Sequence, residues 1–155
     1  MKLKWNVVVL LLSLFFALRA VAQDGDIAVV VNSANSVNNV SMGELRKLLD
    51  GEKRSWPGGQ SVKLFVRAPG TPERTALLHV VNMSESDYKK YWTSQVFKGE
   101  AQAEPVTLPS NGMQKEAVQA FPGALVLMAT AEVKTGLKIL KIDGHLPGEA
   151  GYPLH

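Results

Sequence analysis

The strongest chemical signal in the sequence is residues 67–74, which read RAPGTPER. Gly70 lets backbone amides approach a ligand closely, and Thr71 followed by proline is typical of a helix start. The positive end of a helix dipole, with the guanidinium groups of Arg67 and Arg74 nearby, favours an oxyanion. The simpler alternative is that Thr71 is an ordinary N-cap and that both arginines are solvated.

The remaining reactive residues form no recognisable catalytic cluster. His79, His145 and His155 lie in separate settings, and none has carboxylates at metal-ligand spacing. We expect His79 to be a partly buried structural residue of a helix. No serine has a Gly-x-Ser-x-Gly context, and zero cysteines exclude a disulfide, a thiolate zinc site and an iron–sulfur cluster. We therefore expect no enzyme, no metal site and no cofactor; an exported hydrolase would need a catalytic cluster that the sequence lacks.

Four aromatic residues allow two interpretations. Trp56, Tyr88, Tyr91 and Trp92 could form a platform for a sugar or a peptide. The helical spacing of the last three is more simply that of a stripe facing the core.

The first 22 residues are predicted to be a signal peptide cleaved after Ala22. Basic residues precede the apolar run NVVVLLLSLFFAL, and small residues occupy the last positions before the cut. The uninterrupted apolar part, 7–18, is shorter than the roughly 20 residues that span a bilayer as a helix. We therefore expect an exported, periplasmic protein with one domain over 23–155.

The formal charge of +3 comes from this leader segment. The chain has 17 Lys and Arg against 14 Asp and Glu. Removing Lys2, Lys4 and Arg19 leaves 14 against 14, so the charge gives no support for nucleic-acid binding. The length suits a single core.

Strands and helices alternate along the rest of the chain. Apolar β-branched runs predict strands, and Ser or Thr before an amphipathic run predicts helix starts. Strands are predicted at 26–32, 62–67, 104–108, 124–128 and 138–142, and helices at 41–50, 72–82, 84–99 and 113–120. The tail after 145 is predicted to be irregular.

This order predicts an α/β three-layer sandwich with a mostly parallel or mixed central sheet. Ligands of such sheets bind beyond the carboxyl ends of strands, where loops meet helix N-termini. Two loops qualify, 32–41 and 67–74. Asn32 and Ser36 in the first loop are therefore candidates to face Arg67, Gly70 and Thr71 in the second.

Read together, several segments resemble the periplasmic substrate-binding proteins of phosphate-type ABC transporters, the type II periplasmic binding proteins. The resembling segments, in order, are VVVN (29–32), SMGELRKLLDG (41–51), KRSWPGG (53–59), VKLFVRAPGTPERTALL (62–78), YW (91–92), VFKG (96–99) and FPGAL (121–125). The resemblance implies the fold of one lobe of such a receptor. It also implies an oxyanion cradle at Arg67, Gly70 and Thr71.

The sequence departs from the family pattern in three ways. The loop after Arg67 is short, and Pro69 stands where the family has a serine before glycine. The run ALVLM (124–128) replaces the family's Ala-Ile-Gly-Tyr. The segment that would supply the opposing lobe is absent.

The resemblance implies a binding protein for phosphate or a similar oxyanion, acting in ABC-type uptake or sensing. Its implied partners are an ABC permease or another envelope protein, and a second copy of the chain could complete the site as a homodimer. The alternative is an envelope protein–protein interaction module that keeps the fold without binding a small ligand. No nucleic-acid partner is expected.

Overall fold

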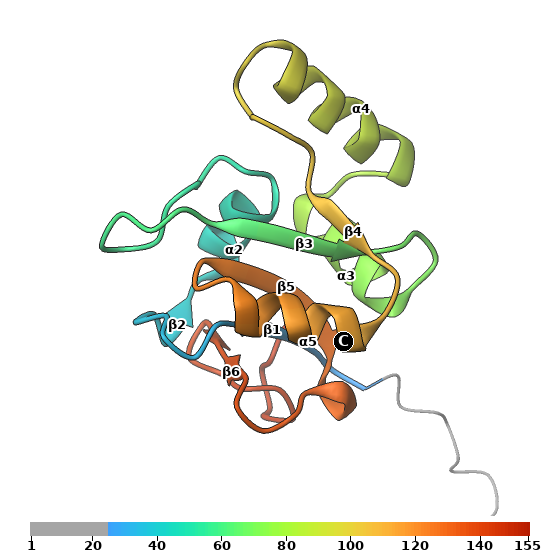
Figure 1. The fold of residues 1–155 in the computed structure, drawn as a ribbon. Coiled ribbons are helices and arrows are strands. Elements are labelled where there is room, and N and C mark those ends of the chain that lie inside the picture. Colours follow the sequence, from blue (N-terminus) through green and yellow to red (C-terminus); the bar gives the residue numbers. More distant parts are fainter. Residues whose placement is uncertain (1–24) are drawn as a thin grey trace, which may run out of the picture.

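The computed structural model describes residues 25–155, so the predicted signal peptide at 1–22 lies outside the described residues. In chain order the elements are β1 (Ile27–Val31), β2 (Asn39–Val40), α2 (Met42–Leu49), β3 (Lys63–Arg67), α3 (Pro72–Val81), α4 (Glu85–Phe97), β4 (Val106–Leu108), α5 (Asn111–Ala120), β5 (Ala124–Ala129), a 3-10 turn η1 (Thr130–Glu132), β6 (Lys138–Ile139) and β7 (Lys141–Ile142). Figure 1 shows their arrangement. No helix within 25–155 has the length and apolar character needed to cross a membrane.

Each of the four α-helices within residues 25–155 begins at a residue whose hydroxyl accepts a hydrogen bond from a first-turn amide. These N-caps are Ser41, Thr71, Ser84 and Ser110. At Ser41 the Glu44 side chain also accepts from the N-cap amide, which completes the predicted capping box. The helix starts are therefore fixed by local sequence.

The central sheet has five strands in the order β4-β3-β5-β1-β6. Strand β3 is parallel to both β4 and β5, whereas β1 is antiparallel to β5 and β6. The predicted α/β class with a mixed sheet is confirmed. The predicted last strand, 138–142, is instead two short strands: β6 joins the central sheet, and β7 pairs with β2 in a separate parallel ladder.

Strand direction decides which loops share an edge of the sheet. Because β3, β4 and β5 run the same way, they end at one edge, which we call the carboxyl edge. Strand β1 runs the opposite way, since Ile27 pairs with Ala129 and Val31 with Leu125. The loop after β1 therefore lies at the opposite edge.

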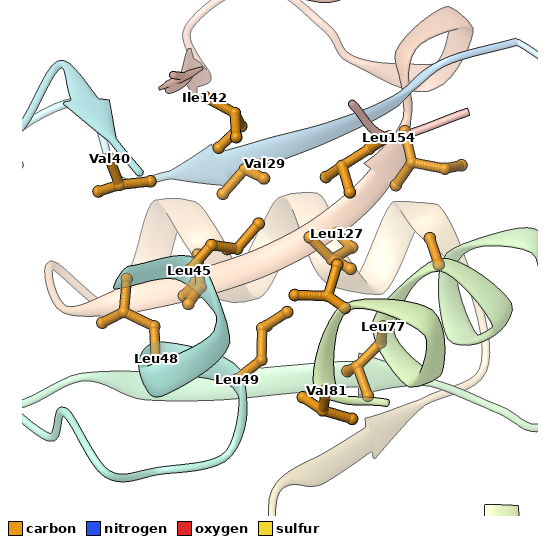
Figure 2. Packing of buried hydrophobic residues seen from close by; sticks show 14 of the residues in the cluster. Val29, Val40, Leu45, Leu48, Leu49, Leu77, Val81, Leu127, Ile142 and Leu154 are labelled. Atoms are coloured by element: carbon orange, nitrogen blue, oxygen red, sulfur yellow. The ribbon is translucent and has the colours of Figure 1, made fainter. Parts of the chain in front are cut away.

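Two apolar layers cover the sheet. Helices α2 and α3 pack on one face, where Figure 2 shows Leu45, Leu49 and Leu77 pointing toward Val29 and Leu127 of the sheet. Helix α5 covers the other face. Each fully buried leucine contributes about 1.5–3 kcal/mol of hydrophobic stabilisation.

The C-terminal tail forms no helix or strand, as predicted, but it packs against β1. Tyr152 and Leu154 are buried. The amide of Ile27 donates to the Leu154 carbonyl at 3.0 Å, and the Tyr152 hydroxyl donates to the Ile27 carbonyl at 2.7 Å. Burial raises the pKa of Tyr152, so this hydroxyl keeps its proton and remains a donor.

Candidate functional site

The loop between β3 and α3 lies at the carboxyl edge and has the predicted form of a helix start. Thr71 accepts a hydrogen bond from the Arg74 amide at 3.3 Å and donates its own to the Ala68 carbonyl at 2.9 Å. Gly70 has a φ of 86°, a conformation that residues with a Cβ rarely adopt. Among residues 25–155 the amides of Gly70 and Glu73 have no partner. Both amides are therefore available to an anion at this helix start.

Arg67 is not solvated, contrary to the simpler interpretation of its sequence. It is the last residue of β3 and is half-buried. Its Nη1 donates to Oδ1 of Asn111 at 2.7 Å, and within the described chain its buried Nε has no partner. The guanidinium is thus held between the end of β3 and the first residue of α5.

Helix α5 brings a second N-terminus to the same edge of the sheet. Its N-cap, Ser110, accepts from the Met113 amide at 3.2 Å. The preceding strand β4 pairs in parallel with β3, with Leu108 opposite Arg67. Two ten-residue helices, α3 and α5, consequently begin at the carboxyl edge on opposite faces of the sheet, and the Arg67 guanidinium contacts the start of α5. Each helix dipole contributes roughly 0.3–1 kcal/mol toward binding an anion.

The prediction that Asn32 and Ser36 face this cradle is wrong. The antiparallel direction of β1 places both at the opposite edge of the sheet. Asn32 is buried, and its Nδ2 donates to the carbonyls of Val118 and Gln119 at the end of α5. It caps the C-terminus of α5, whereas Ser36 is exposed.

Arg74 is also unavailable to an anion. It is buried and forms a bidentate ion pair with Glu85 of α4, with Nε–Oε2 at 3.0 Å and Nη2–Oε1 at 2.6 Å. This hydrogen bonding holds the pKa of Glu85 below its ordinary value. The guanidinium also stacks on Tyr88, 4.6 Å from the ring centre. Arg74 therefore joins α3 to α4.

The aromatic residues are structural. Tyr88 and Trp92 are buried and pack edge-to-face with centroids 6.1 Å apart, as expected of a core-facing stripe. Tyr91 is partly buried and donates to the Asp50 carbonyl.

His79 is exposed, so the prediction of partial burial is wrong. It lies on the outer face of α3.

Two hollows open on the described part of the molecule, and neither contains the cradle. The larger, of about 420 Å³, lies beside the start of β3 and is lined by Leu48, Leu64 and Trp92 among others. The smaller, of about 220 Å³, touches the loop at Pro69, but its Arg74 is already paired. Gly70 is exposed and Arg67 and Thr71 are partly exposed, so the cradle lies at the surface.

Sequence reasoning missed the contribution of α5. The residues concerned are Ser110 and Asn111. A signal was present, because strand 104–108 followed by Ser110 repeats the pattern of strand 62–67 followed by Thr71. Parallel pairing of those two strands was the missing information.

No family model matches the chain. Similar solved structures include an ABC-type phosphate transport receptor from Vibrio cholerae, with 17% identity and a TM-score of 0.63 over 79% of this chain and 48% of that chain. A candidate phosphate ABC transporter substrate-binding protein from Clostridium perfringens, with bound phosphate, has 16% identity and a TM-score of 0.64 over 79% and 47%. PstS from Borrelia burgdorferi has 15% identity and a TM-score of 0.59 over 79% and 49%. The chain thus spans about half the length of these proteins and has the fold of one lobe.

Proposed function

We propose that this chain is an exported, periplasmic domain that binds phosphate or a similar small oxyanion and acts with an ABC-type permease in uptake or sensing. The observation that carries the proposal is that the α3 and α5 N-termini and the Arg67 guanidinium all lie at the carboxyl edge. The three receptors named above, one of them with bound phosphate, support the same ligand class. The role is binding rather than catalysis. No observation favours the homodimer considered from the sequence, and we propose none.

The proposed ligand groups lie in the loop and at the strand end. They are the outward edge of the Arg67 guanidinium, the amides of Gly70 and Glu73, and the hydroxyl of Thr71. A phosphate oxygen would compete with Asn111 for Arg67 and with the Ala68 carbonyl for Thr71. These are charge-assisted hydrogen bonds, which are stronger than neutral ones.

The expected affinity is low because the cradle lies at the surface. A charge-assisted pair contributes about 1.5–3 kcal/mol and each helix dipole roughly 0.3–1 kcal/mol. Together they correspond to a dissociation constant on the order of a millimolar. A second chain that covers the carboxyl edge would exclude water and tighten binding. We infer that the permease or another envelope protein provides this cover.

A phosphate titration of the purified protein, followed by amide shifts in ¹H–¹⁵N NMR spectra, tests the proposal. The shifts should saturate in the millimolar range and concentrate at 67–74 and 110–113. Arg67→Ala should weaken binding about tenfold, and Thr71→Ala less. The matched control is Arg54→Ala, because Arg54 is exposed and precedes β3 at the far end of that strand. Absence of saturable shifts at 50 mM phosphate, with ionic strength held constant by chloride, would remove the proposal.

A further inference from the structure

Gln114 on α5 is a buried polar residue whose amide is unpaired. Only 1% of its surface is exposed, and within residues 25–155 neither Oε1 nor Nε2 has a hydrogen-bond partner. Buried polar groups in folded proteins are nearly always paired, because an unpaired one loses its hydration without compensation. An apolar side chain of the same length would avoid this cost. Packing alone therefore does not account for glutamine here.

A second unpaired group lies on the same side of the sheet. The Nε of Arg67 is buried and has no partner in the described chain. Side chains alternate along a strand, so Arg67 shares a face of β3 with Phe65, which packs in the layer under α5. The unpaired Nε–H donor of Arg67 and the unpaired side-chain amide of Gln114 therefore lie in the same layer, between the sheet and α5.

Helix geometry puts these two groups close together. Asn111 and Gln114 are three residues apart, which is nearly one turn, so they follow one another on the same face of α5. The Asn111 side chain already contacts the Arg67 guanidinium. Since α5 runs back from the carboxyl edge, Gln114 lies one turn further from that edge than Asn111, on the same helix face and in the same buried layer as Phe65.

The buried Nε also decides which edge of the guanidinium faces outward. Guanidinium presents its five N–H groups in a rigid plane, and oxyanions are bound best by two parallel N–H groups. With Nε turned inward, the edge formed by Nη1 and Nη2 is presented to the carboxyl edge. An acceptor at Nε would hold the plane in that orientation while an anion displaces Asn111 from Nη1.

We propose that Gln114 is a positioning residue for Arg67: its Oε1 accepts the Nε–H hydrogen bond when an oxyanion draws the guanidinium toward the start of α3. This inference rests on the proposed function, since it concerns the same site. Gln114 does not touch the ligand. It is unpaired in the free protein and becomes paired in the complex.

The test compares the wild-type protein with Gln114→Met, which keeps the length of the side chain and removes the amide. Gln114→Leu is the second variant, in case the first packs poorly. The matched control is Gln119→Leu, a similar change on the exposed face of the same helix. Three quantities are measured: the melting temperature, the dissociation constant for phosphate by NMR titration, and the ¹H–¹⁵N signal of Arg67 Nε, assigned by its loss in Arg67→Lys.

We expect Gln114→Met to melt no lower than wild type and to bind phosphate about tenfold more weakly. In wild type, phosphate should shift the Arg67 Nε–H signal and slow its exchange with water, and this response should vanish in the variant. A purely structural glutamine would lower the melting temperature and leave the Nε–H response intact, which would overturn the proposal. Equal phosphate affinity in wild type and both variants would overturn it too. If wild type binds no phosphate, the proposed function fails on that measurement alone and this inference falls with it.

Discussion

Replacing Asn32 by alanine should destabilise the fold and leave phosphate binding unchanged. The buried amide donates to the Val118 carbonyl at 2.7 Å and the Gln119 carbonyl at 3.3 Å, and its Oδ1 accepts from the Ala34 amide at 2.8 Å. Loss of three hydrogen bonds, with buried groups left unpaired, costs about 2–4 kcal/mol. For a domain of this size each kcal/mol lowers the melting temperature by roughly 3–4 °C. Asn32→Ala should therefore melt roughly 6–16 °C lower.

Distance is the reason to expect unchanged binding. Five residues of β3 separate the two edges of the sheet, which corresponds to about 16 Å along the strand. A neutral side chain at that separation has no direct contact with an anion at Arg67.

The assay pairs thermal unfolding, followed by circular dichroism, with the NMR phosphate titration. Asn38→Ala is the control, because Asn38 is exposed and only its carbonyl is used, as an acceptor for the Lys141 amide. It should change neither quantity. If Asn32→Ala melted like wild type and bound phosphate several-fold more weakly, the assignment of Asn32 to the opposite edge, and the strand direction behind it, would be refuted.

Two further predictions concern the packing around α4. Because the hydrogen bonds from Arg74 lower the pKa of Glu85 in the folded state, the ionised carboxylate stabilises the fold at neutral pH, and this contribution is lost as the pH falls from about 4.5 through the lowered value. Glu85→Gln should therefore show a smaller drop in melting temperature between pH 7 and pH 3 than wild type, and an equal drop would contradict the reasoning. Gly51 has a φ of 77°, and a Cβ there would lie 2.5 Å from the Trp92 ring. Gly51→Ala should lower the free energy of unfolding, measured in urea, by about 2–4 kcal/mol. The control is Gly58→Ala, where φ is also positive but nothing lies within 4 Å, and it should lower this free energy by about 1–2 kcal/mol. Equal losses in the two variants would show that the Trp92 contact is unimportant.

The elements were predictable because their signals are local. An N-cap, the periodicity of the following turn and a glycine after the last turn lie within a dozen residues of one another, as at Ser41 and Gly51. The apolar run of β1 likewise predicts a strand without reference to the rest of the chain. The same locality applies to Arg67, Gly70 and Thr71, which are nearly contiguous.

Strand direction was not predictable from those signals. A fully buried strand has the same composition whether it runs parallel or antiparallel, and the partner of β1 lies about a hundred residues later in the chain. The misplacement of Asn32 follows from this. Contacts between separate elements also decide the roles of the two arginines, because Arg74 pairs with Glu85 and Arg67 with Asn111. The sequence alone therefore did not distinguish the role of Arg67 from that of Arg74.

The antiparallel insertion of β1 also has a consequence for the order of folding. Strand β1 pairs only with β5 and β6, and its first residue is bonded to Leu154. The segment from α2 to β4 can form contacts early, whereas β1 must await β5, β6 and Leu154, which lie about a hundred residues later in the chain. Loop closure over such separations slows folding. A nascent chain would therefore leave β1 without its sheet partners until β5 and β6 have been synthesised.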